Sequence, residues 1–215
     1  DGQGMVFRIN PCLTSGIPSL TDNNDADSAQ LNNERIGVTI PGLDGSGFLQ
    51  GPYASTAPTS TQARANEPSL QFNYTRSDNR FEEVMSYYYT DKAERYIQSL
   101  GFMNINNRVV GIDVNGTTAD NSFYSPSTKN VTFGTGGVDD AEDSDVIYHE
   151  LGHAIQDNQV PGWGATEEGG AMGEAFGDYW AGSESAGVGP QSPGWDPYIA
   201  EWDATSYNPG NPAYL

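Results

Sequence analysis

Hydrophobic residues recur with a clear helical period in one long segment of the chain. Between residues 81 and 100 they lie at spacings of three and four, which is typical of one buried face of an amphipathic helix. Gly101 follows as a helix stop. A second helix is predicted from about Ser144 to Asn158, because acidic residues occupy its first turn and Pro161 comes soon after it. A third helix is predicted from about Glu168 to Ala181.

Short apolar stretches between turn-forming residues predict strands elsewhere. The first 70 residues are rich in Asn, Ser, Thr, Asp, Gly and Pro, and only 5–7 and 36–40 have strand character there. We therefore expect residues 1–70 to form a loop-rich N-terminal extension with short strands. In 71–215 the predicted strands are 108–114, 121–124 and 131–133, with a turn at Asn115-Gly116.

The charge balance excludes several kinds of partner. The 215 residues include 29 acidic and 9 basic ones, for a net charge of −20. Nucleic-acid binding needs an excess of Lys and Arg, and anionic membranes would repel this chain. No apolar run approaches the roughly 18 residues of a membrane-spanning helix. The opening Asp1-Gly2-Gln3-Gly4 lacks signal-peptide character, so we expect any such signal to have been removed. Cys12 is the only cysteine, which excludes an internal disulfide and a Cys-based zinc site.

The candidate chemistry centres on the segment His149-Glu150-Leu151-Gly152-His153, which contains the only two histidines. A separation of four residues places both rings on one helix face, where they can bind a single cation. Glu150 is rotated by about 100° from His149 and can instead reach a metal-held water as a general base. The alternative is a surface helix that carries two histidines by accident.

A catalytic zinc site needs three protein ligands, and Glu174 is the expected third. Asp178 lies four residues later on the same helix face, where two carboxylates repel each other. A cation bound by Glu174, with Asp178 accepting the His149 N–H, would offset that repulsion. Four glycines in this helix cost about 1 kcal/mol each, which predicts a close approach to the histidine helix; they are Gly170, Gly173, Gly177 and Gly182. The alternative for Glu174 is a solvated carboxylate.

Together, segments 149–153 and 170–178 resemble the gluzincin metallopeptidases of the thermolysin and fungalysin branch. Those enzymes carry the same histidine helix and a downstream glutamate ligand. The resemblance implies an α+β fold in which residues 71–215 form a zincin-like lobe with a small, mostly antiparallel sheet. It also implies zinc, secretion and endopeptidase activity on peptide or protein substrates.

The resemblance covers about residues 74–205. The helix at 81–100 resembles the long helix behind the family's sheet, 130–134 resembles a central strand, and 199–202 resembles a segment beyond the ligand helix. The residues that resemble the family's substrate-pairing edge strand are Asn121, Ser122, Phe123 and Tyr124.

One feature of the family has no counterpart in this sequence. Thermolysin-like enzymes complete the cleft with a C-terminal helical lobe that supplies a histidine to the oxyanion, whereas both histidines here are assigned to the metal. We therefore expect a truncated or processed N-terminal lobe with an open site, whose partner is the C-terminal lobe of the same precursor. The alternative is a catalytically weak or silent, zinc-stabilised lobe that acts as a binding or regulatory module.

Calcium is a second candidate cofactor. Similar enzymes place a calcium ligand four residues before the first histidine, and several later acids could supply further hard oxygens. The candidate ligands are Asp145, Glu184, Asp196, Glu201 and Asp203, and an acidic solvated surface is the alternative. The run Asp22–Asp27 resembles the start of a calcium loop, but Ala26 occupies a ligand position, so a solvated acidic loop is expected.

Overall fold

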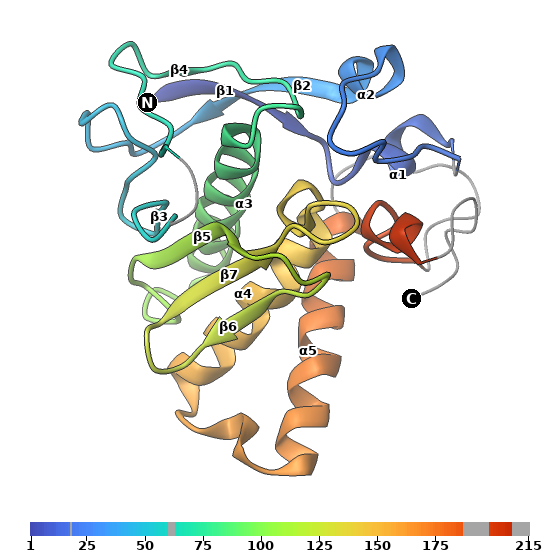
Figure 1. The fold of residues 1–215 in the computed structure, drawn as a ribbon. Helices are drawn as coiled ribbons and strands as arrows, with labels where there is room; N and C mark the ends of the chain where they lie inside the picture. The colour runs from blue at the N-terminus through green and yellow to red at the C-terminus, as the bar shows by residue number, and fades with distance from the viewer. Residues whose placement is uncertain (18, 60–62, 187–197, 208–215) are drawn as a thin grey trace.

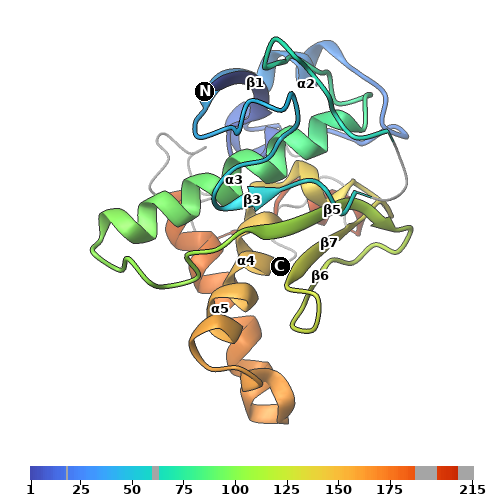
Figure 2. The same ribbon diagram turned by 90° about the vertical axis from the view of Figure 1, so that its left-hand side faces the viewer.

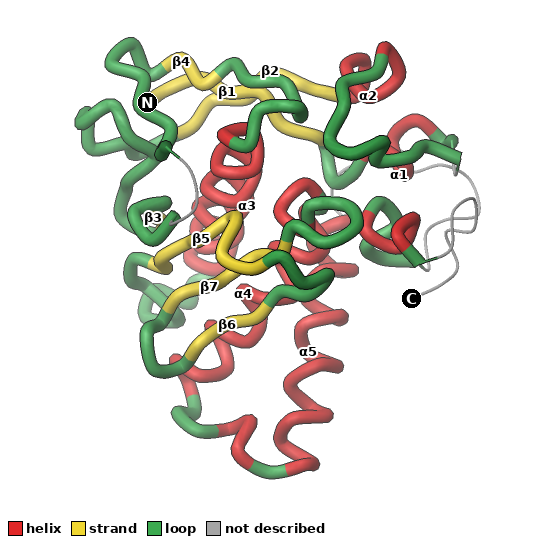
Figure 3. Tube along the Cα trace, viewed as in Figure 1, coloured by secondary structure: helices red, strands yellow, loops and turns green. Residues whose placement is uncertain are grey.

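The computed structural model describes residues 1–17, 19–59, 63–186 and 198–207. In this part of the chain, five α-helices accompany two small sheets, so the coarse α+β prediction is confirmed. Figures 1 and 3 show the two sheets as separate layers with the long helices beneath and behind them. The strands are β1 (Gly2–Phe7), β2 (Arg35–Ile40), β3 (Ala54–Ser55), β4 (Gln71–Phe72), β5 (Val110–Thr117), β6 (Phe123–Ser125) and β7 (Asn130–Gly134). The helices are α1 (Pro11–Ser15), α2 (Ala29–Glu34), α3 (Arg80–Ser99), α4 (Ser144–Gln159) and α5 (Glu167–Ala186), with 3₁₀ turns η1 (Asp140–Glu142), η2 (Trp163–Ala165) and η3 (Asp203–Ser206).

Both sheets mix parallel and antiparallel pairing. The first has the order β2-β1-β4 and the second β3-β5-β7-β6. In the second sheet, β3–β5 and β5–β7 are parallel and only β6–β7 is antiparallel, so the expectation of a mostly antiparallel sheet is wrong. The reason is that neither parallel pair is joined by a hairpin: α3 lies in the connection between β3 and β5, and β6 lies in the connection between β5 and β7, so the chain returns in the same direction each time.

Helix α3 joins the two sheets. Its apolar face packs against β1 on one side and β5 on the other, and it also contacts α4 (Figure 2). Phe81, Val84 and Met85 on this face are fully buried, as the sequence period predicts. Gly101 follows with a φ of 95°, a left-handed conformation that glycine adopts without strain. The two later helices are also confirmed, and α5 extends five residues beyond its predicted end.

Residues on both sides of position 70 share one buried hydrophobic cluster. Val6, Phe7 and Leu31 belong to it together with residues as distant as Trp202. The division at residue 70 stays a prediction about organisation, but several described residues before position 70 belong to the same hydrophobic core as the rest of the structure.

The predicted turn at Asn115-Gly116 is wrong, whereas the predicted acidic loop at Asp22–Asp27 lies at the surface with one end tied down. Asn115-Gly116 lies inside β5, at a register shift against β7, and a side chain at Gly116 would overlap Thr132. The acidic run that begins at Asp22 is partly tied down, because Asp22 Oδ1 lies 2.5 Å from Arg76 Nη2. Arg76 in turn forms a fully buried ion pair with Glu142, which attaches this loop to the segment before α4.

Candidate metal centre

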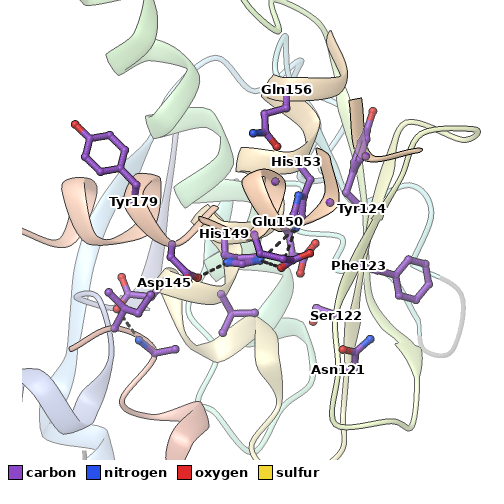
Figure 4. Close-up of a pocket in the computed structure, with 18 of the residues that line it drawn as sticks. Asn121, Ser122, Phe123, Tyr124, Asp145, His149, Glu150, His153, Gln156 and Tyr179 are labelled. Carbon is purple, nitrogen blue, oxygen red and sulfur yellow. Dashed lines mark hydrogen bonds and ion pairs between the residues drawn. The ribbon is translucent and has the colours of Figure 1, made fainter. Parts of the chain in front are cut away.

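The two histidines project from one face of α4, as their spacing predicts. Their Nε2 atoms lie 3.2 Å apart. Glu174 reaches them from α5, with its Oε2 atom 3.1 Å from His149 Nε2 and 3.7 Å from His153 Nε2. The structure therefore brings the three predicted ligands together. They come from two helices that run side by side (Figure 1), and Figure 4 shows the two histidines.

Glycine allows α4 and α5 to approach this closely. A Cβ atom on Gly152 would lie 2.9 Å from the Cα atom of Gly177, and a Cβ atom on Gly177 would lie 2.8 Å from His149 Nδ1. Gly173 faces His153 at a looser 3.6 Å. A Cβ atom on Gly170 would meet nothing within 4 Å, so the close-packing explanation applies to the middle of α5 and not to Gly170.

Asp178 fixes the orientation of the first histidine. Its Oδ1 atom lies 2.8 Å from His149 Nδ1. A carboxylate at this nitrogen favours the tautomer that carries the proton on Nδ1, which leaves Nε2 with a free lone pair. Asp178 is thus placed where the sequence predicts, behind the ring and on the side away from Glu174.

Glu150 is buried beside the centre, with 6% of its surface exposed. Burial is the main reason that its pKa is raised to about 7, and the negative charge of Glu174 raises it further, while His149 opposes the shift. Its Oε2 atom has no hydrogen-bond partner in the described part of the chain. Glu150 can therefore hold or release a proton close to neutral pH at the wall of the centre.

Strand β6 forms the edge of its sheet next to Glu150 (Figure 4). The strand begins at Phe123 rather than at the predicted Asn121, because the Ser122 hydroxyl is engaged by Asp140 and by the Gly134 N–H instead. Tyr124 anchors β6 to α4, since its hydroxyl donates to Asp157 Oδ2 at 2.8 Å. The four predicted edge residues thus lie along one wall, with two of them ahead of the strand.

A groove of about 1410 Å³ runs between β6 and the two helices. The groove is lined by the two histidines and Glu150, by the η2 turn with Trp163, and by Asn121 to Tyr124. Glu174 keeps 66% of its side chain exposed, so the candidate centre opens to solvent within the described structure. No Lys or Arg lines the groove in the described ranges.

Asp145 and Glu201 of the predicted calcium set lie close enough to interact electrostatically, but its described members do not form a compact metal-binding group. Asp145 is buried and accepts hydrogen bonds from the Ala200 N–H and the Ser185 hydroxyl. Glu201 Oε2 accepts from Asn10 at 2.6 Å, and Glu184 does not join a compact metal-binding group. Asp196 lies outside the described residues.

Asp203, the last predicted calcium ligand, belongs to a different group. Its carboxylate lies with those of Asp120 and Asp140, which the sequence analysis missed. The acidic run before α4 was visible in the sequence, but only the fold shows that Asp140 meets residues 20 positions before it and 63 positions after it.

Comparison with known proteins does not place this chain in a family. No protein-family model matches the chain, and no curated protein is significantly similar to it. No helix in the described ranges has both the length and the apolar character needed to cross a membrane.

Proposed function

We propose that this chain is the N-terminal, zincin-like lobe of a zinc-dependent endopeptidase of the gluzincin type. The observation that carries the proposal is the convergence of His149, His153 and Glu174, with Glu150 at the same centre. The edge strand beside them and the open groove support a peptide or protein substrate.

The three ligand atoms fit a zinc ion. Zinc binds imidazole nitrogen and carboxylate oxygen at about 2.0–2.2 Å, usually as a tetrahedron. Two ligand atoms at that distance from a tetrahedral centre are about 3.3 Å apart. The pairs here are separated by 3.1, 3.2 and 3.7 Å, which matches three corners of such a site.

His149, His153 and Glu174 would hold the ion. A zinc ion bound there would polarise the scissile carbonyl group and lower the pKa of an attacking water. Glu150 accepts the water proton on a carboxylate oxygen and then delivers it to the leaving amine. Asp178 keeps His149 in the tautomer whose Nε2 atom faces the centre.

The β6 edge supplies the means of holding an extended substrate. Unpaired backbone groups at a sheet edge can add a peptide as a further strand. Within the described structure β6 pairs with β7 alone, so its other edge faces the groove. A substrate bound there would run past Glu150.

The developing oxyanion needs a donor, but no Lys or Arg is among the described residues that line the groove, and both histidines are assigned to zinc. Removing one such donor typically costs about 10²–10³ in rate. We therefore propose that a C-terminal lobe of the same precursor completes the cleft. The competing function, a silent zinc-stabilised lobe, is favoured by the same openness but leaves the buried Glu150 without a role.

Hydrolysis of a peptide library by the zinc-loaded chain tests the proposal. Glu150→Gln should abolish hydrolysis while zinc remains bound, because the amide keeps the shape of the side chain but cannot accept the proton. Glu168→Gln, an exposed position in the first turn of α5, is the matched control and should retain activity. Equal turnover by E150Q and E168Q would refute the general-base role, and zinc binding without any hydrolysis by the chain joined to its downstream sequence would favour the silent lobe.

A further inference from the structure

A second group of carboxylates lies along the groove, separate from the histidine centre. Asp120, Asp140 and Asp203 each offer one oxygen, and these oxygens all lie within 4.8 Å of one another. The residues come from three distant parts of the chain, namely the segment between β5 and β6, η1 and η3. All three line the groove.

One oxygen of each of these carboxylates lacks the partner that a buried polar atom normally has. Asp140 is 3% exposed, and its Oδ1 atom has no hydrogen-bond partner in the described structure. The Oδ1 atoms of Asp120 and Asp203 are likewise buried without a partner there. None of the ion pairs between described residues involves any of the three. Three carboxylates held together in this way repel one another and lose solvation, so the arrangement calls for a counter-charge.

The close approach and burial of these carboxyl groups raise the pKa values of Asp203 and Asp140. Burial is the main cause that raises the pKa of Asp203 to about 8, and the charges of Asp140 and Asp120 add to it. Burial likewise raises the pKa of Asp140 to about 6, although the Ser122 hydroxyl opposes the shift.

We propose that Asp120, Asp140 and Asp203 bind a calcium ion. All the donors are hard anionic oxygens, which calcium and magnesium prefer and which zinc sites use less. Calcium binds oxygen at about 2.3–2.6 Å, so two of its ligands lie at most about 5 Å apart. Oxygens within 4.8 Å of one another can therefore share one calcium ion after at most a small movement of the side chains. Magnesium requires shorter bonds in a nearly regular octahedron and gives up its bound water reluctantly. It should therefore bind these three carboxylates more weakly than calcium does.

The site would hold one end of the groove in place. Asp120 directly precedes the edge residues, and the Ser122 hydroxyl donates to Asp140. The Tyr207 hydroxyl donates to the Asp120 carbonyl oxygen at 3.3 Å, which links the same segment to the end of η3. A cation on the three aspartates would therefore fasten η1 and η3 to the segment that leads into β6. This role requires neither zinc nor peptide hydrolysis.

Calorimetric titration of the metal-stripped full chain with Ca²⁺ alone, and separately with Mg²⁺ alone, tests the proposal. The wild-type chain should bind calcium more tightly than magnesium. Asp140→Asn should lose one calcium equivalent or weaken it by at least about tenfold. Asp139→Asn is the matched control, because Asp139 is the neighbouring residue and equally buried. Burial is the main cause that raises its pKa, and the groups that shift it further include Glu142 and Asp25 but none of the three proposed ligands. D139N should keep the wild-type stoichiometry.

Asp203→Asn provides a second test if Asp140→Asn fails to fold, which circular dichroism would reveal. Calcium should raise the melting temperature of the wild type and of D139N, and should not do so for D203N. Absence of calcium binding by the wild type would overturn the proposal and indicate that the carboxylates share protons instead. Wild-type calcium affinity in D140N or D203N would overturn it equally.

Discussion

His149 shows how single residues define the candidate centre. Its ring lies between Asp178 at Nδ1 and Glu174 at Nε2, and a carboxylate on each side holds it in one orientation. The sequence predicts this arrangement well, because positions four apart on a helix share a face and the helical period alone aligns the histidines. The sequence does not predict Asp120 and Asp140 as partners, since only the fold brings their loops together.

Replacing Asp178 tests the role of that orientation. Asp178→Asn should weaken zinc binding by about 10–100-fold, because the amide no longer favours the proton on His149 Nδ1. Competition with a chromophoric chelator measures the affinity. Glu167→Gln, on the same helix but away from the centre, should bind zinc like the wild type. Unchanged affinity in D178N would contradict the assignment of Asp178.

At the scale of elements, the contact between α4 and α5 decides whether the ligands meet. The glycines predict a close approach, but their pattern alone does not identify which of them lie at the contact. The structure separates Gly177, where a Cβ would press on the His149 ring, from Gly170, where it would meet open space. Strand boundaries were harder to predict, because the Ser122 hydroxyl is bonded to Asp140 and shifts the start of β6 to Phe123.

Alanine variants at Gly170 and Gly177 test whether only the second glycine lies at the close contact between the helices. Gly170→Ala should raise the free energy of unfolding by up to about 1 kcal/mol, because alanine favours the helix and nothing obstructs its methyl group. Gly177→Ala should lower the stability and weaken zinc binding, since the methyl group would displace either His149 or α5. Urea unfolding and chelator competition measure both quantities. Similar behaviour of the two variants would show that the helices are less closely packed than the structure indicates.

At the scale of the whole molecule, buried acids make stability depend on pH. Glu94 on α3 is fully buried, and its Oε1 atom accepts a hydrogen bond from Asn106 at 2.6 Å. Burial is the main cause that raises its pKa from the ordinary 4.5 to about 7, with Asn106 and Arg108 opposing the shift. The hydrophobic period predicts which face of α3 is buried. It does not predict that Glu94 is buried as well, because Glu94 is covered by the α3–β5 loop only once the chain has folded.

The sign of the effect follows from proton binding in the two states. Between pH 4.5 and about 7 the unfolded chain loses the Glu94 proton while the folded chain keeps it, so the free energy of unfolding falls as the pH rises. Glu94→Gln is neutral throughout and should show a shallower fall between pH 5 and 8. Denaturant unfolding at constant metal content measures this, with E168Q as the control that retains the wild-type slope. An identical slope in E94Q would contradict a protonated, buried Glu94.

The most direct test of the central claim is an anomalous-scattering measurement at the zinc absorption edge, on crystals of the chain grown with zinc. The account predicts one strong peak within about 2.0–2.2 Å of His149 Nε2, His153 Nε2 and a Glu174 oxygen. A map with no peak in bonding contact with both imidazole rings would contradict it.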